Sequence, residues 1–256
     1  MTDTHCHLDY FEPEELDAAL ENAKDFRALV SVGINPERIG RTLEIAGRAR
    51  NIYVAAGLHP TEAQHLEEAK NQLAELAKHP KVRAIGETGL DFYWKPETRD
   101  KQYEALDFQA ALADKLNLPL IFHIRSPNGD DRAEREIADW LKLHRPRRLV
   151  LHAFGGHQAL AQIGGDLGAY FSFGGPLTYK KNIQAREVAK VLPVGKLLVE
   201  TDSPFLPPEP HRGKRNQPAF VRFTLAKLAE VREVPVEVLE HITDSNAETC
   251  FAFREN

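Results

Sequence analysis

Eight short segments, most of them rich in valine, isoleucine or leucine, recur along this chain of 256 residues, and longer amphipathic stretches separate them. This alternation is typical of parallel strands that are buried on both faces and are each followed by a helix. An open, doubly wound sheet shows the same alternation, but it needs fewer strands and commonly carries a glycine-rich turn after the first one. Here the first run ends in His5-Cys6-His7 instead, so we expect an α/β fold of the (β/α)8 TIM-barrel type. The expected strands are 2–7, 28–33, 52–57, 82–87, 120–124, 149–152, 169–173 and 197–200.

The intervals between these runs have helical spacing. Leu16, Ala19, Leu20 and Ala23, for example, are three and four residues apart and form one apolar stripe that should cover the barrel. A proline-rich loop, 203–211, follows the eighth run, and helical patterns then cover 217–231, 236–242 and 246–253. The length suits one barrel, so we expect a single domain over residues 1–256.

Composition narrows the class of protein. The chain is 42% hydrophobic and 28% charged, as in globular proteins, and no segment approaches the roughly 18 apolar residues of a membrane span. The first residues lack the basic start and apolar run of a secretory signal, so we expect a cytoplasmic protein. Cys6 and Cys250 should be free thiols. The net charge of −5 argues against a broad electrostatic attraction to nucleic acid, but it is compatible with a local cluster of basic residues at one end of the barrel.

Metal-binding residue types stand at the ends of the expected strands. Two histidines two residues apart leave the same face of the first strand, and one further histidine or carboxylate ends or follows the fourth, fifth, sixth and eighth. In a barrel these strand ends meet at one mouth. Burying so many polar groups there without a cation would be costly, so the pattern predicts a metal centre. The candidate ligands are His5, His7, Glu87, His123, His152 and Asp202.

Six ligands exceed the three or four protein groups that one zinc ion usually takes. We therefore expect two divalent ions a few ångströms apart, with the Glu87 carboxylate between them. Imidazole ligands favour zinc or manganese, and magnesium substitutes in such pairs, so the identity of the ion stays open. Glu87 and Asp202 are the candidate catalytic residues: Asp202 either accepts a proton from the attacking water or serves as a ligand alone.

Several residues near these strand ends are candidates for substrate binding. Arg125 shares a strand face with His123, and Arg212 and Arg215 follow the eighth strand, so each is expected to reach a phosphate at the mouth or to belong to a solvated basic loop. His59, after the third strand, either contacts substrate or has a capping or packing role. The aromatic segment 92–94 follows the fourth strand and offers either a face for a nucleobase or ordinary packing at the rim.

Seven segments together resemble one known family. Residues 3–9 read Asp-Thr-His-Cys-His-Leu-Asp, residues 86–93 read Gly-Glu-Thr-Gly-Leu-Asp-Phe-Tyr, and residues 200–204 read Glu-Thr-Asp-Ser-Pro. With segments 57–60, 118–123, 152–156 and 212–216, which occur in family order, they resemble the TatD family of metal-dependent deoxyribonucleases. That family belongs to the amidohydrolase-like barrels, and the resemblance covers nearly the whole chain.

The resemblance implies a division of the ligands and an activity. His5, His7 and Asp202 would hold one ion, His123 and His152 the second, with Glu87 bridging. The implied reaction is removal of nucleotides from 3′ ends, a 3′-5′ exonuclease acting on single-stranded DNA, with no obligate protein partner. The chain departs from the family pattern in the loop 123–131, so the substrate entrance is expected to differ there. Residues 61–63 also depart from the pattern, which commonly has a second histidine at that place.

Two other functions remain open at this stage. The same metal pair could hydrolyse another ester or amide bond, such as the ester of a D-amino acid on tRNA, because fold and ligands do not fix the substrate. Glu87 occupies the place where many amidohydrolase barrels carry a modified lysine, which disfavours the cyclic amidases. The third possibility is a metal-binding barrel without catalysis.

Overall fold

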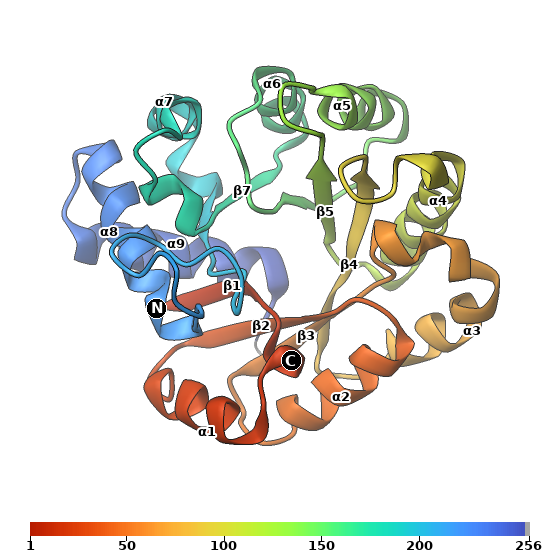
Figure 1. The fold of residues 1–256 in the computed structure, drawn as a ribbon, viewed down its shortest axis with the longest axis horizontal. Helices are drawn as coiled ribbons and strands as arrows, with labels where there is room; N and C mark the ends of the chain where they lie inside the picture. Colours follow the sequence, from red (N-terminus) through yellow and green to blue (C-terminus); the bar gives the residue numbers. More distant parts are fainter. Residues whose placement is uncertain (254–256) are drawn as a thin grey trace.

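Eight parallel strands and the helices between them form a barrel (Figure 1). The computed structural model describes residues 1–253, and the expected TIM barrel is confirmed: the strands pair in chain order, from β1 to β8. Their bounds agree with the predicted runs to within one or two residues, except for the end of β4. The strands are β1 Thr2–Cys6, β2 Ala28–Gly33, β3 Ile52–Ala56, β4 Val82–Asp91, β5 Leu120–Arg125, β6 Leu149–Leu151, β7 Tyr170–Phe173 and β8 Leu197–Val199.

The barrel closes just beyond the end of β8. Cys6 forms a parallel bridge with Ser203, the backbone N–H of Asp202 donates to the carbonyl oxygen of His5 at 2.8 Å, and the N–H of His7 donates to Ser203 at 2.7 Å. The segment after β8 is therefore held against the end of β1. This closure brings Asp202 beside His5 and His7, at the end of β1.

Nine helices of the described residues follow these strands or end the chain. Proline and asparagine begin and end several of them: Pro13 and Pro36 open α1 and α2, and Asn117 ends α4 in a left-handed conformation. The helices are α1 Pro13–Asn22, α2 Pro36–Ala46, α3 Leu66–Leu76, α4 Arg99–Leu116, α5 Arg132–His144, α6 Gln158–Leu167, α7 Ile183–Val191, α8 Val221–Arg232 and α9 Val236–Phe251.

Two predicted boundaries were wrong. The helical patterns 236–242 and 246–253 belong to one helix, α9: the hydroxyl of Thr243 donates to the carbonyl oxygen of Leu239 inside it, so this weak helix former is accommodated rather than breaking the helix. Strand β4 continues to Asp91, four residues past the predicted end. Its last residues pair with β5, although Thr88 and Gly89 lack the apolar character of a strand.

Apolar side chains pack on both faces of the strands, outside and inside the barrel. One layer packs the outer faces of the strands against the helices. The other fills the barrel with side chains such as Val30, Ile121 and Leu198, and Cys250 and Phe251 from the end of α9 pack against it. Helix α9 thus covers one end of the barrel, and the polar strand ends lie at the other. Both cysteines are buried free thiols, as expected.

None of the helices within residues 1–253 combines the length and the apolar composition that crossing a membrane requires.

Candidate metal centre

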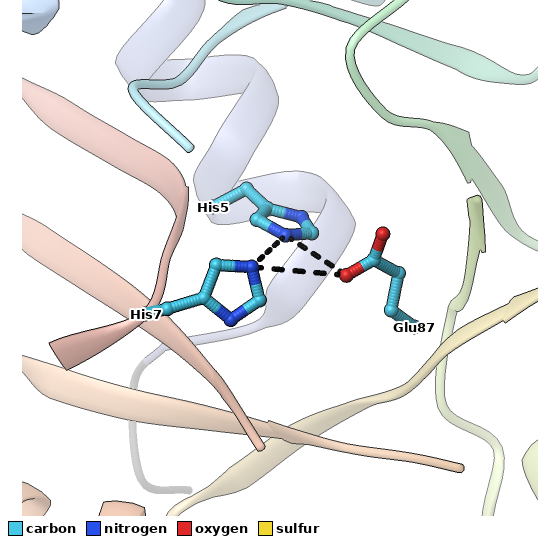
Figure 2. A group of neighbouring side chains, drawn as sticks. All are labelled: His5, His7 and Glu87. Atoms are coloured by element: carbon cyan, nitrogen blue, oxygen red, sulfur yellow. Dashed lines mark hydrogen bonds and ion pairs between the residues drawn. The ribbon is translucent and has the colours of Figure 1, made fainter. Parts of the chain in front are cut away.

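His5, in β1, and His7, directly after β1, point at one oxygen of Glu87 (Figure 2). Nε2 of His5 and Nε2 of His7 lie 3.3 Å apart. They lie 3.4 and 3.8 Å, respectively, from Oε2 of Glu87. All three side chains are nearly inaccessible to solvent. The alternation of side chains along a strand explains the pairing, because residues two apart share a face while Cys6 between them packs outward.

Asp202 completes this half of the cluster. Its Oδ1 lies 3.3 Å from Nε2 of His7 and 3.7 Å from Nε2 of His5. The backbone of Asp202 is left-handed, with φ of 56°, and the hydrogen bond from its N–H to the carbonyl of His5 fixes this turn against β1. Two imidazole nitrogens and two carboxylate oxygens therefore converge on one small volume.

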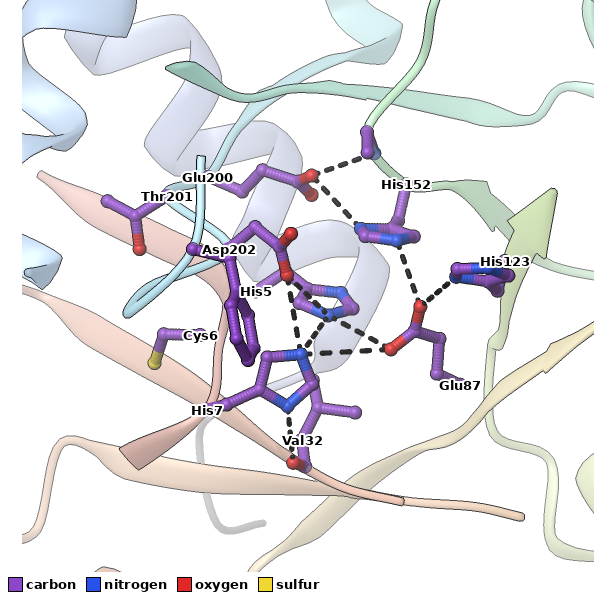
Figure 3. Close-up of polar contacts among 12 residues, drawn as sticks. His5, Cys6, His7, Val32, Glu87, His123, His152, Glu200, Thr201 and Asp202 are labelled. Carbon is purple, nitrogen blue, oxygen red and sulfur yellow. Dashed lines mark hydrogen bonds and ion pairs between the residues drawn. The ribbon is translucent and has the colours of Figure 1, made fainter. Parts of the chain in front are cut away.

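The other oxygen of Glu87 faces a second pair of histidines (Figure 3). Oε1 lies 2.6 Å from Nδ1 of His123 and 3.0 Å from Nε2 of His152. The Glu87 side chain thus separates the cluster into two halves, with one carboxylate oxygen toward each. All six sequence-predicted ligands come together in this one place.

Glycine at position 89 allows β5 to approach β4 at this point. A Cβ there would lie 2.1 Å from the carbonyl oxygen of His123, and φ of Gly89 is +138°, a conformation that other residues rarely adopt. The absence of a side chain at Gly89 therefore helps to set where His123 stands relative to Glu87.

Each of three histidines hydrogen-bonds a fixed acceptor through the ring nitrogen that points away from Glu87. Nε2 of His123 lies 2.9 Å from Asp91, and Nδ1 of His152 lies 3.1 Å from Glu200. Nδ1 of His7 donates to the carbonyl oxygen of Val32 at 3.0 Å. A carboxylate or carbonyl only accepts, so the outer nitrogen carries a proton, and once the inner nitrogen has lost its own proton its lone pair is directed into the cluster. This tautomer is the one that binds a metal ion, so the residues present fit a cation on either side of Glu87.

Asp91 and Glu200 were not singled out from the sequence, although both stand in the quoted motifs. Both are fully buried. Asp91 lies four residues after Glu87 on β4 and therefore shares its face, and Glu200 directly follows β8. These two placements are the signals that could have identified them.

The charges in the cluster balance one another. Burial raises the pKa of Glu87, but the positive charges of His152 and His123 outweigh it and hold that pKa well below its ordinary value. Burial likewise lowers the pKa of His7, but the hydrogen bond and charge of Asp202 dominate and raise it to about 9. Protons on these imidazoles supply the positive charge that a bound cation would otherwise provide.

His59 lies at the edge of this cluster. Its Nε2 is 3.7 Å from Oε1 of Glu87, and burial, helped by the neighbouring His123, lowers its pKa to about 3. Nδ1 of His59 accepts from the backbone N–H of Thr61 at 3.2 Å, which caps the short 3-10 helix Pro60–His65. The expected capping role is present, and contact with substrate remains a prediction.

A cavity of about 690 Å³ opens above the cluster. Trp94 and Arg125 line it on the side of β4 and β5, and Tyr10, Phe205 and Leu206 line it on the side of β1 and β8. The exposed guanidinium of Arg125 lies 4.3 Å from the ring centre of Tyr93. A second cavity of similar size, about 650 Å³, lies near the opposite end of β5 and contains none of the candidate ligands.

The structure does not bring Arg212 and Arg215 to the cavity. The guanidinium of Arg212 lies 4.3 Å from the ring centre of Tyr179. Arg215 donates to the carbonyl oxygen of Tyr10 at 2.6 Å and faces Glu15 at 3.4 Å. Neither residue belongs to the cavity wall, because both side chains are engaged in these other contacts.

Known proteins resemble the chain over almost its full length. The family model described as TatD related DNase matches residues 2–252. A Bacillus subtilis (strain 168) protein named "Uncharacterized metal-dependent hydrolase YabD" is 37% identical, with 98% of each chain covered. The Escherichia coli (strain K12) protein named "Uncharacterized metal-dependent hydrolase YcfH" is 34% identical, covering 98% of this chain and 95% of its own. The crystal structure of YJJV, a TatD homologue from E. coli K12, superposes with a TM-score of 0.89 at 32% identity, covering 98% of both chains. With its clusters of histidine and carboxylate groups able to hold metal, the chain belongs to the TatD family of metal-dependent hydrolases.

Proposed function

We propose that this hydrolase removes nucleotides from the 3′ end of single-stranded DNA by cleaving phosphodiester bonds with two divalent ions. The observation that supports this most is the position of Glu87, whose two carboxylate oxygens each face a separate set of imidazole nitrogens. His5, His7 and Asp202 would hold one ion and His123 and His152 the other, with Glu87 bridging them. Zinc, manganese or magnesium would fill this role.

Divalent ions in such a pair polarise the scissile group and lower the pKa of a bound water. The residues of the chain position the reaction. Asp202 contacts the imidazoles of His5 and His7 through Oδ1, and among the described residues no hydrogen bond or ion pair involves Oδ2. That oxygen is free to accept a proton from the attacking water, so we assign Asp202 the role of general base as well as ligand.

The wall of the cavity suits a nucleotide. Arg125 is exposed and lines the cavity beside His123, where its guanidinium would pair with a phosphate of the substrate. Trp94 lines the same side and is 60% exposed, which leaves its ring open to a nucleobase. His59, neutral and at the edge of the cluster, would donate or accept a hydrogen bond without adding charge.

The test is a metal-dependent cleavage assay. Chelator-treated protein receives magnesium, manganese or zinc and single-stranded DNA labelled at its 5′ end. Metal should restore stepwise shortening from the 3′ end, and Glu87→Ala should abolish it. Glu75→Ala, which changes an exposed glutamate on α3, should leave the rate unchanged.

Metal-loaded protein that leaves DNA intact would overturn the nuclease proposal. Aminoacyl-tRNA carrying D-amino acids and simple esters would then be assayed with the same variants. Hydrolysis of one of these compounds that depends on Glu87 would identify a different ester as the substrate. If none of the substrates is hydrolysed, the chain would be a barrel that binds metal without catalysis.

A further inference from the structure

Three large apolar side chains line the cavity with much of their surface open to water. Trp94 is 60% exposed, Phe205 44% and Leu206 40%. Exposed apolar surface is unfavourable in water, and where it gathers around a polar site it commonly marks a surface that a ligand covers. Trp94 is already part of the proposed function. Phe205 and Leu206 have no role in it.

Phe205 and Trp94 come from opposite sides of the barrel. Trp94 follows β4, whose neighbour is β5, and Phe205 follows β8, which is held beside β1. In a sheet of eight strands that closes in chain order, these two pairs of strands face each other, as Figure 1 shows for β1 and the pair β4 and β5. The Glu87 cluster lies between them, with Asp202 and His7 on the Phe205 side and His123 on the Trp94 side.

Several contacts hold the Phe205 side in place. The backbone N–H of Phe205 donates to the carbonyl oxygen of Asp202 at 2.9 Å, so the ring is tied to a candidate ligand. Its ring centre lies 5.4 Å from that of Tyr10, edge to face. Tyr10 is itself fixed from behind: the guanidinium of Arg38 lies 3.8 Å from its ring centre, and Arg38 pairs at 2.7 Å with the buried Asp9.

We infer that Phe205 is a specificity-determining residue that stacks the nucleobase on one side of the scissile phosphate, while Trp94 stacks the base on the other side. The inference rests on the proposed function. A scissile bond centred on Glu87 would place its two neighbouring nucleosides in this cavity, and a partly exposed aromatic side chain lines the cavity on each side. The enzyme would therefore require two consecutive nucleotides that both carry bases.

Abasic substrates test this pairing directly. One single-stranded oligonucleotide carries an abasic unit as its 3′-terminal residue, and a second carries it one position earlier, so that the two units flank the first bond to be cut. Wild-type enzyme should lose roughly tenfold in kcat/KM on each substrate, because the loss of one stack between a base and an aromatic ring has an effect of that size. The effect should not depend on which base is missing, since every base can stack. Leucine replaces each ring, because it keeps apolar bulk but not the flat face.

The kcat/KM of Phe205→Leu on intact DNA should be roughly tenfold lower than that of wild type, and it should fall no further with one of the two abasic substrates. The kcat/KM of Trp94→Leu should fall no further with the other abasic substrate. Phe223→Leu, a partly buried ring that packs against Phe220 outside the cavity, is the matched control and should behave as wild type. The metal content and melting temperature of every variant are measured, so that a damaged cluster is recognised.

The inference is overturned if wild-type enzyme shortens DNA while Phe205→Leu keeps the full wild-type penalty on both abasic substrates. It is also overturned if both variants become insensitive to the same position. Failure of the wild-type enzyme to cut any DNA is a different result, because it removes the proposed function itself.

Discussion

Nε2 of His123 lies 2.9 Å from Oδ2 of Asp91, a fully buried carboxylate on the neighbouring strand. Because the other ring nitrogen faces Glu87, Asp91 decides which nitrogen carries the proton and how the imidazole is oriented. Asp91→Asn keeps the shape, and its amide oxygen can still accept from the N–H groups of Tyr93 and Trp94. We expect this variant to bind metal roughly 10 to 100 times more weakly, measured by calorimetric titration of metal-free protein.

The matched control for Asp91→Asn is Asp107→Asn on helix α4, far from the cluster, whose carboxylate accepts from the indole of Trp140. Its metal affinity should equal that of wild type. Unchanged affinity in Asp91→Asn would mean that the buried carboxylate has only a structural role.

Metal binding should release protons at neutral pH. The pKa of His7 is about 9 without metal, and Glu87 helps to raise the pKa of His152 well above its ordinary value despite the opposing effect of burial. Both imidazoles are therefore protonated at pH 7, and a metal ion must displace those protons. The apparent affinity for metal should rise with pH up to the pKa of His7. Above that pH the deprotonation of His7 should add no further rise. Calorimetry in buffers of different ionisation heat measures this release, and a heat independent of buffer would contradict it.

Gly89→Ala should weaken the junction between β4 and β5. The new methyl group would lie 2.1 Å from the carbonyl oxygen of His123, at a φ of +138°. We expect a loss of roughly 3 kcal/mol in the free energy of unfolding, measured with urea, together with weaker metal binding. Gly165→Ala is the control, because a Cβ there meets nothing within 4 Å and the site is helical, so stability should stay equal or rise.

Phe251 should be important for stability and not for the chemistry. It is fully buried at the end of α9, where it packs against the side chains that fill the barrel. Phe251→Ala should cost about 3–5 kcal/mol of unfolding free energy. Metal content of the folded fraction should not change, because the metal centre lies at the other end of the barrel. Val191→Ala, at a side chain that is 78% exposed, should change the free energy of unfolding by less than about 0.5 kcal/mol.

The barrel and the six clustered residues were predictable because both depend on regular geometry. Buried strands show themselves as apolar runs, and parallel strand ends meet at one mouth, so His5, Glu87 and Asp202 could be brought together without coordinates. The loops follow no such period. The contact of Arg212 with Tyr179 depends on how its loop packs, and the approach of Phe205 to Tyr10 depends on the closure beyond β8.

Anomalous X-ray diffraction from crystals grown with manganese would show whether Glu87 bridges two ions. We expect two anomalous peaks roughly 3.5–4 Å apart, one between Glu87 and the pair His5 and His7, the other between Glu87 and the pair His123 and His152. A single peak, or peaks away from the Glu87 carboxylate, would contradict it.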